Sequence, residues 1–310
     1  MNSASISIVY FGTPEFAVAP LQKIVEAGYE VKAVVTQPDR PSGRGKKLQA
    51  PAVKTYALSQ GLFVLQPEKI NKETQATLAS FAADLFVVCA YGKILSQKII
   101  DMPKHIINIH ASLLPKYRGA APIHAAICAG EKETGVSIMK IVKELDAGDV
   151  MLMKPLPISH DDNLETVTTK LSDVGAQAIM QAIEKIVQQE VQWQPQNEVL
   201  ATYAHKIHPD DGKVMWNQPA AQIHNFIRSF APQPGAFTYI NDEKIKILST
   251  QITDQVTQER PGSLYKDKKS LYVACSDFWI EIKMLQPLGK KMMDVSSFLN
   301  GYRKSLTQCQ

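Results

Sequence analysis

Residues 6–35 read ISIVYFGTPEFAVAPLQKIVEAGYEVKAVV, and this stretch indicates the fold class of the first part of the chain. Its two apolar ends are predicted to be strands. Between them, Thr13 and Pro14 suit the start of a helix, apolar residues recur at helical spacing, and Gly28 ends the helix. A strand, a helix and a second strand in this order are typical of the start of a nucleotide-binding α/β sheet. Gly12 stands without the other glycines of a GxGxxG pattern, so a dinucleotide is not indicated.

The same alternation of strands and helices continues to about residue 187. Residues 85–90 are continuously apolar, which is typical of a parallel strand buried on both faces. The amphipathic stretch at 164–187 predicts a long helix that packs back on the sheet. The other predicted helices are 52–60, 71–81 and 121–129, and the other predicted strands are 63–65, 106–110, 135–141 and 150–158.

The chain changes character after residue 188. Residues 189–209 are polar and interrupted by prolines, and we interpret them as a linker. A helix at 220–230 and several short strand-like runs separated by turn signals such as Asn241-Asp242 then favour a small β-barrel. We therefore expect a Rossmann-like α/β domain with a mostly parallel sheet at 1–188 and a small, OB-like barrel domain at 210–310.

Composition narrows the class of protein. Of the 310 residues 45% are hydrophobic, enough for a substantial core. The four cysteines form no CxxC pair, which indicates free thiols in a reducing cytoplasm and no metal site. No apolar run suits a membrane span, and the first residues do not read as a signal peptide, so a cytoplasmic protein is expected. Residues 205–310 hold 14 Lys and Arg against 10 Asp and Glu, which fits a polyanionic partner or a solvated lysine-rich surface equally well.

Two polar side chains stand at the end of the predicted strand 106–110. Asn108 and His110 should point the same way, because side chains alternate along a strand. Both can donate to an oxygen that gains negative charge, and His110 can also move a proton. Asp146, in the carboxylate-rich turn 144–149, could orient the ring. Taken alone, these residues could instead be a turn cap, a core histidine and an Asx turn.

Residues 36–48 form the most basic short stretch. Their two prolines, two glycines, two arginines and two lysines predict a flexible loop with no regular structure. The loop would lie beside the carboxyl-terminal edge of a parallel sheet, where substrates usually bind, and could grip phosphates. A solvated loop without a partner is an equally good explanation.

Several stretches carry a resemblance to a known family. They are FGTPEFA at 11–17, QPDRPSGRGKK at 37–47, AYG at 90–92, NIHASLLPKYRGAAP at 108–122 and LDAGD at 145–149. Nearly the whole chain resembles the methionyl-tRNA formyltransferases. The chain departs from that pattern at Gln233, where the family usually carries tryptophan, and at Ser96, where proline is common.

The resemblance implies a reaction and a set of functional residues. The reaction transfers the formyl group of the co-substrate 10-formyltetrahydrofolate, without a metal, to the α-amine of methionine on initiator tRNA. Asn108 and His110 would stabilise the oxyanion, and His110 with Asp146 would transfer the proton. A monomer that does not bind membranes is expected. The implied folate-binding residues are Ser112, Leu113, Leu114 and Pro115, and the implied tRNA-binding residues are Arg40, Arg44, Lys46, Lys47 and Lys206.

Two other functions remain open at the level of sequence. A formyltransferase acting on a small amine, such as a nucleotide sugar or a purine precursor, would keep Asn108, His110 and Asp146 and leave the basic residues 40–47 unexplained. A non-catalytic tRNA-binding protein would require these three residues to be accidental. A formyl-transfer assay that compares charged initiator tRNA, charged elongator tRNA and small amines separates the three functions.

Overall fold

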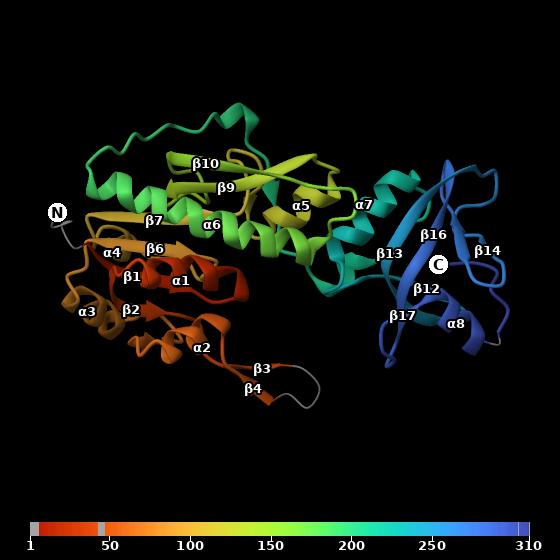
Figure 1. The fold of residues 1–310 in the computed structure, drawn as a ribbon, viewed down its shortest axis with the longest axis horizontal. Coiled ribbons are helices and arrows are strands. Elements are labelled where there is room, and N and C mark those ends of the chain that lie inside the picture. Colours follow the sequence, from red (N-terminus) through yellow and green to blue (C-terminus); the bar gives the residue numbers. More distant parts are fainter. Residues whose placement is uncertain (1–5, 43–46, 303, 310) are drawn as a thin grey trace. The chain divides into compact units, whose positions relative to one another are not determined.

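The structure of the protein, a computed structural model, describes residues 6–42, 47–302 and 304–309. The chain packs as two compact units (Figure 1). The first unit contains Met1–Gly119, Thr134–Pro157 and Thr168–Tyr203, and the second contains Ala120–Glu133, Ile158–Val167 and Ala204–Gln310. Two short segments that the sequence places within residues 1–188 therefore pack in the second unit.

A seven-stranded sheet forms the first unit, in the order β10-β9-β7-β6-β1-β2-β5. The pairs β1/β2, β1/β6, β2/β5 and β6/β7 are parallel, and β9 runs antiparallel to β7. The predicted mostly parallel α/β sheet is thus confirmed. From β1 the chain continues to β2 on one side of the sheet, and the later strand β6 pairs with the other side of β1. Sheets in which the strand order reverses at such a point bind ligands at the carboxyl ends of their strands. The strands are β1 (Ser7–Gly12), β2 (Glu30–Val35), β5 (Val64–Leu65), β6 (Leu85–Cys89), β7 (His105–His110), β9 (Glu133–Lys140) and β10 (Val150–Pro157).

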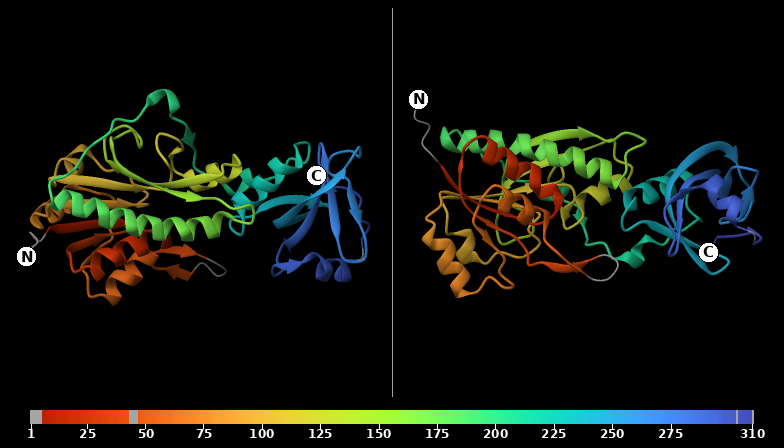
Figure 2. Two further views of the ribbon diagram at one scale, coloured as in Figure 1. Left: turned by 45° about the horizontal axis from the view of Figure 1, so that its top comes forward. Right: turned by 60° about the horizontal axis from the view of Figure 1, so that its bottom comes forward.

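Helices cover both faces of this sheet, so its central strands are buried throughout. On one face, Val9 and Phe86 pack with Leu78 of α3 and Ile99 of α4. On the other face lie α1 and the long helix α6, which Figure 2 shows side by side. A Cβ on Gly175 of α6 would approach Ile109 Cγ2 of β7 to 3.3 Å, so α6 packs directly on the sheet. The helices are η1 (Glu15–Ala17), α1 (Val18–Glu26), α2 (Ala52–Ser59), α3 (Lys72–Ser80), α4 (Gln97–Ile100) and α6 (Leu164–Val187).

Local structure departs from the sequence prediction at two places in the first unit. Thr13 does not cap the first helix: its hydroxyl donates to the Tyr91 carbonyl at 3.0 Å, and the helix opens with the 3-10 turn η1. Part of the predicted loop 36–48 is instead an antiparallel hairpin of β3 (Arg40–Ser42) and β4 (Lys47–Gln49). Composition predicted a loop because strands this short carry no period-2 signal.

The second unit is built on an antiparallel sheet in the order β12-β13-β16-β15-β14, with β17 paired to β16. Asn241 and Asp242, both at positive φ, turn β12 into β13 as a two-residue hairpin requires. Helix α7 packs its apolar face on the sheet, and α5 packs on α7. The described residues form this sheet without closing it into the predicted barrel. The elements are α5 (Pro122–Cys128), α7 (Ala220–Phe230), β12 (Ala236–Ile240), β13 (Glu243–Val256), β14 (Leu264–Lys266), β15 (Leu271–Ala274), β16 (Phe278–Pro287), β17 (Met293–Asp294) and α8 (Val295–Gly301).

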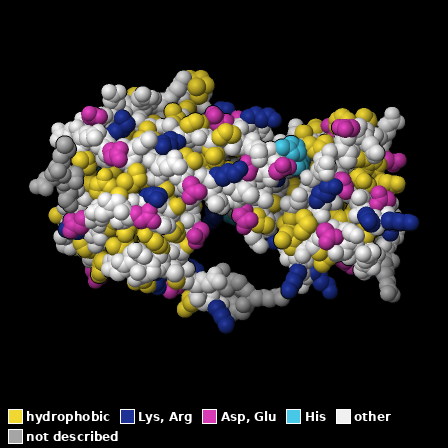
Figure 3. All heavy atoms as spheres, in the orientation of Figure 1, with side chains coloured by type: hydrophobic (Ala, Val, Ile, Leu, Met, Phe, Trp, Pro, Cys, Tyr) yellow, Lys and Arg dark blue, Asp and Glu magenta, His cyan; other side chains and the backbone are white. Residues whose placement is uncertain are grey.

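Four short elements lie outside the two large sheets. They are β8 (Arg118–Gly119), η2 (Glu198–Leu200), β11 (Tyr203–Ala204) and η3 (Pro209–Gly212). On the face drawn in Figure 3, Lys and Arg side chains are interspersed with Asp and Glu over both units. Within residues 6–42, 47–302 and 304–309, no helix has both the length and the apolar character needed to cross a membrane.

Candidate active site

Asn108 and His110 lie at the carboxyl end of β7, between two partner strands. Asn108 pairs with Val88 of β6 and Met139 of β9, so the backbone under the site is held from both sides. The Asn108 side chain is partly exposed, and it makes no hydrogen bond to any residue that the structure describes. A carboxamide without a protein partner at the open end of a strand can donate to a substrate oxygen.

The ring of His110 has two different neighbours. Its Nε2 lies 2.9 Å from the carbonyl oxygen of Tyr117. A carbonyl only accepts, so Nε2 carries the hydrogen and Nδ1 of the neutral ring keeps its lone pair. Nδ1 lies 3.7 Å from Oδ2 of Asp146, within ion-pair range and too far for a hydrogen bond. Nδ1 is therefore the atom that can take a proton, beside a carboxylate that would stabilise the resulting charge.

The turn that carries Asp146 is tightly constrained. Asp146 has a φ of +49°, a left-handed conformation that few residues other than glycine adopt. Its Oδ2 accepts a hydrogen bond of 2.8 Å from the Gly119 amide. A side chain at Gly148 would collide with the Lys140 carbonyl oxygen, at 2.1 Å from the new Cβ. The contacts of this turn thus hold Asp146 beside His110, although the two residues are far apart in the chain.

The turn after β7 holds the four residues that the resemblance assigns to folate. Ser112 is fully buried, and its hydroxyl donates to the Lys116 carbonyl at 2.6 Å. Ser137 of β9 donates to the Ser112 carbonyl and accepts from the Leu114 amide, at 2.7 and 3.0 Å. Leu114 is buried against Met139 and Val150. Leu113 and Pro115 are the partly exposed members of the turn.

The residues expected to bind tRNA are distributed over both units. Arg40, in β3, forms an exposed ion pair of 2.8 Å with Glu68. Lys47, in β4, and Lys206, in the second unit, are exposed. Arg44 and Lys46 lie outside the described residues.

Two residues near the site carried no functional prediction. Arg118 is 1% exposed and donates to Gln196, whose amide in turn donates to the turn that carries Asp146. Arg118 belongs to the same motif as Asn108 and His110, so the sequence pointed to it indirectly. Gln196 lies in the stretch interpreted as a linker and carried no such signal.

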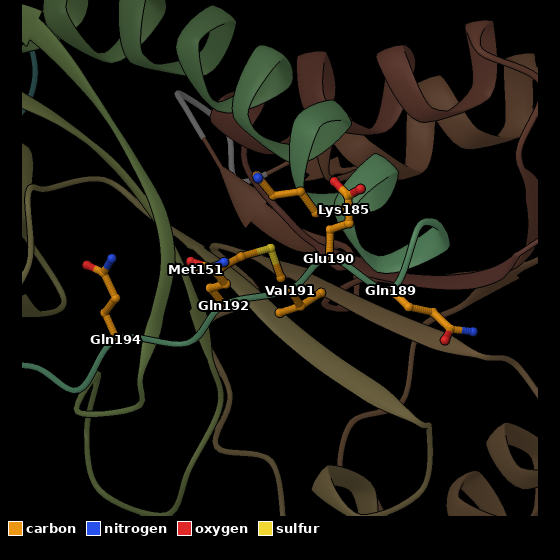
Figure 4. Close-up of a pocket in the computed structure, with 7 residues that line it drawn as sticks. All are labelled: Met151, Lys185, Gln189, Glu190, Val191, Gln192 and Gln194. Atoms are coloured by element: carbon orange, nitrogen blue, oxygen red, sulfur yellow. The ribbon is translucent and has the colours of Figure 1, made fainter.

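A cavity of about 480 Å³ lies elsewhere in the first unit, where β10 meets the end of α6 (Figure 4). Its lining is mostly polar and includes none of the predicted site residues. The lining residues are Met151, Lys185, Gln189, Glu190, Val191, Gln192 and Gln194. Within the described part of the chain, no three His, Cys, Asp or Glu side chains come close enough together to hold a metal ion.

Comparison with known proteins places this site in a family. The Formyl transferase family matches residues 5–183, and the Formyl transferase C-terminal domain family matches residues 206–303. These two matches, one for each part of the chain, define a two-domain formyl-transferring enzyme. The chain is 44% identical to the methionyl-tRNA formyltransferase of Thermodesulfovibrio yellowstonii over 96% of both chains. It is 41% identical to that of Enterococcus faecalis over 97% of both. The chain belongs to the methionyl-tRNA formyltransferase family.

Solved structures share the fold at lower identity. An N-formyltransferase from Helicobacter canadensis, in complex with folinic acid and dTDP-3-aminofucose, superposes with a TM-score of 0.70 at 20% identity, over 91% of this chain and 99% of that one. The methionyl-tRNA formyltransferase from Clostridium thermocellum gives a TM-score of 0.56 at 15% identity, over 80% and 94% of the two chains. At these identities the likeness concerns the fold alone.

Proposed function

We propose that Asn108, His110 and Asp146 carry out the reaction of the family in this chain. That reaction moves the formyl group of 10-formyltetrahydrofolate to the α-amino group of methionine on initiator methionyl-tRNA, giving N-formylmethionyl-tRNA for translation initiation. The observation that carries the proposal is the approach of His110 Nδ1 to Asp146 Oδ2, at 3.7 Å, on the strand end that also carries Asn108.

The chemistry is an acyl transfer from one nitrogen to another. The methionine amine forms a bond to the formyl carbon, and the carbonyl oxygen becomes an oxyanion that the Asn108 amide stabilises. Nδ1 of His110 takes the proton that the amine loses, while Asp146 stabilises the imidazolium. The protonated ring can then join Asn108 in donating to the oxyanion. The imidazolium returns the proton to the folate nitrogen as the bond from that nitrogen to the formyl carbon breaks.

The folate co-substrate is proposed to bind against the turn of Ser112, Leu113, Leu114 and Pro115. Ser112 and Leu114 are buried in packing with β9, so they shape the turn from below. Direct contacts with the pterin then come from the partly exposed Leu113 and Pro115 and from main-chain groups, as in other pockets for flat ligands.

The tRNA is proposed to contact the hairpin and the C-terminal domain, through Arg40, Arg44, Lys46, Lys47 and Lys206. An OB-like barrel at 210–310, following a catalytic domain at 1–188 and a linker at 189–209, would suit an oligonucleotide. Support for the barrel comes from the chain end: Cys309 bridges Ile240 of β12, and Gln308 bridges Ser263 beside β14, so one segment touches both edges of the sheet. We further propose that the protein acts as a cytoplasmic monomer.

A formyl-transfer assay tests the proposal. The wild-type protein is given 10-formyltetrahydrofolate with charged initiator tRNA, charged elongator tRNA or a nucleotide-linked amino sugar. Formylation of the initiator tRNA alone, abolished or strongly slowed in Asn108→Ala, is the expected result. Preferred formylation of the amino sugar, or an unaffected Asn108→Ala protein, would contradict it.

A further inference from the structure

The segment 193–203, named here the strap, is fastened to the first unit along its length. Gln194 exchanges two main-chain hydrogen bonds of 2.9 Å with Val150 of β10. Lys140 places its ammonium 4.5 Å from the ring centroid of Trp193. Thr202 accepts hydrogen bonds of 2.8 Å from the amides of Tyr117 and Arg118. The first part of the stretch interpreted as a linker is therefore an integral part of the catalytic unit.

Gln196 is the strap residue that reaches the turn carrying Asp146. Its Nε2 donates to the Asp146 carbonyl at 2.8 Å and to the Gly148 carbonyl at 2.7 Å. Both hydrogens of one amide are thus used to hold the two ends of a three-residue turn. The left-handed backbone of Asp146 belongs to a sparsely populated region, and such a conformation persists only when its surroundings determine it.

Arg118 fixes the orientation of the Gln196 amide. Its Nε and Nη2 donate to Gln196 Oε1 at 3.0 and 2.9 Å. A flipped amide would point its own hydrogens at the guanidinium and its oxygen at two carbonyls, so only one orientation is compatible with these neighbours. Glu198 binds the far side of the guanidinium at 2.9 and 2.7 Å and raises the pKa of Arg118, so the buried charge is paired.

The same group of residues also controls the side chain of Asp146. Gly119, next to Arg118 in the chain, donates its amide to Asp146 Oδ2. Asp146 is therefore held at its backbone carbonyl by Gln196 and at its carboxylate by the residue that follows Arg118. Oδ2 is also the atom nearest to His110 Nδ1.

We propose that Gln196 is a positioning residue for formyl transfer, which with Arg118 holds Asp146 Oδ2 in place beside His110. This inference rests on the proposed role of Asp146. Gln196 does not touch the reacting atoms, and it acts by keeping the turn in the one conformation that presents the carboxylate to the ring. A misplacement of about 1 Å at such a site lowers the rate by roughly a hundredfold.

The test compares Gln196→Glu and Gln196→Ala with the matched control Gln194→Glu. Glutamate at 196 still accepts from Arg118 and loses both donations to the turn, whereas Gln194 is exposed and binds Val150 only through its backbone. We expect either change at 196 to lower kcat by roughly 10- to 100-fold, with KM for the charged tRNA and for 10-formyltetrahydrofolate within about twofold of wild type. The control should retain the wild-type kcat. If Gln196→Ala does not fold, Gln196→Glu and Arg118→Lys give the same comparison.

A second background separates positioning from general stability. In Asp146→Asn, the carboxylate that Gln196 positions is already gone, so adding Gln196→Ala should lower kcat no further. An equal loss of kcat from Gln196→Ala in both backgrounds would overturn the proposal, as would an unchanged kcat in Gln196→Ala. Full activity of Asp146→Asn alone would instead overturn the proposed function, so the two failures are distinguishable.

Discussion

The carboxamide of Asn108 is the simplest group to test, because its amide has no partner among the described residues. We expect Asn108→Ala to lower kcat about a hundredfold, corresponding to about 3 kcal/mol of lost stabilisation of the oxyanion. The Kd for charged initiator tRNA should change less than about twofold, since Asn108 is not among the residues proposed to bind it. Single-turnover kinetics and tRNA titration measure the two quantities. A variant that turns over at the wild-type rate would remove Asn108 from the mechanism.

At the residue scale, the sequence offered Asn108 and His110 through strand alternation and Asp146 through a carboxylate-rich turn, and their roles stay predictions. The structure adds the distance of 3.7 Å between His110 Nδ1 and Asp146 Oδ2. The carbonyl of Tyr117, which assigns the hydrogen to Nε2, was not foreseen, because it is a main-chain group of a left-handed residue. Gln196 was not predicted either. Its contacts with Arg118 and with the turn that carries Asp146 are tertiary, and they leave no pattern in the local sequence.

At the scale of the element, two of the residues proposed to bind tRNA lie in the β3–β4 hairpin, Arg40 in β3 and Lys47 in β4, and Arg44 lies between them in the sequence. We expect Arg44→Ala to reduce the ratio of kcat/KM for initiator tRNA to kcat/KM for elongator tRNA by about tenfold. A change of this size corresponds to the loss of one charge-assisted contact. KM for 10-formyltetrahydrofolate should stay the same. Lys32→Ala, which removes a partly exposed cation paired with Glu30, is the matched control. Unchanged kinetics of Arg44→Ala with both tRNAs would exclude the hairpin from tRNA selection.

The buried His224 and the half-buried His124 make the second unit sensitive to acid. Burial lowers the pKa of His124 on α5 and of His224 on α7, each to about 4. The unfolded chain protonates histidine near pH 6.5, so between about 6.5 and 4 the unfolded state binds more protons. The stability that the neutral rings contribute is present above that window and is lost as the pH falls through it. We expect the free energy of unfolding in urea to fall between pH 7.5 and 5.

The histidine variants show whether these rings cause the fall. Replacing both His124 and His224 with glutamine should flatten the decline, whereas His205→Gln, at an exposed position, should not. Asp84 titrates in a different window, because Lys104 and the backbone of Ser7 lower its pKa to about 2, so its contribution is lost only below about pH 3.8. An unchanged pH dependence in the double variant would exclude the two rings.

Helices and strands were predictable where a hydrophobic pattern, continuous or periodic, extended over the whole element. The continuously apolar strand became β6 and the 24-residue amphipathic stretch became α6, because each pattern spans its whole element. The three-residue strands β3 and β4 and the 3-10 turn η1 could not be read in this way. Their structures depend on a cross-strand partner and on the Tyr91 carbonyl that accepts from Thr13, neither of which leaves a local pattern.

At the scale of the whole molecule, the excess of basic residues in the C-terminal part should set the salt dependence of tRNA binding. We expect Lys206→Ala to reduce the slope of log K against log salt by about one, the value for one phosphate contact. Discrimination between tRNAs should not change. Lys98→Ala, on α4 of the first unit, is the control. A slope equal to that of the wild type would show that Lys206 contacts no phosphate.

The attachment of the strap affects the order in which the enzyme becomes competent during synthesis. A ribosome that has completed α6 has already made Asn108, His110 and Asp146, yet the glutamine that grips the aspartate turn has not emerged. A nascent chain or proteolytic fragment ending at Val187 would contain the sheet and all three reactive groups, but the turn that carries Asp146 would lack its hydrogen bonds from Gln196. Formylation would therefore reach its full rate only after the strap has left the exit tunnel and docked.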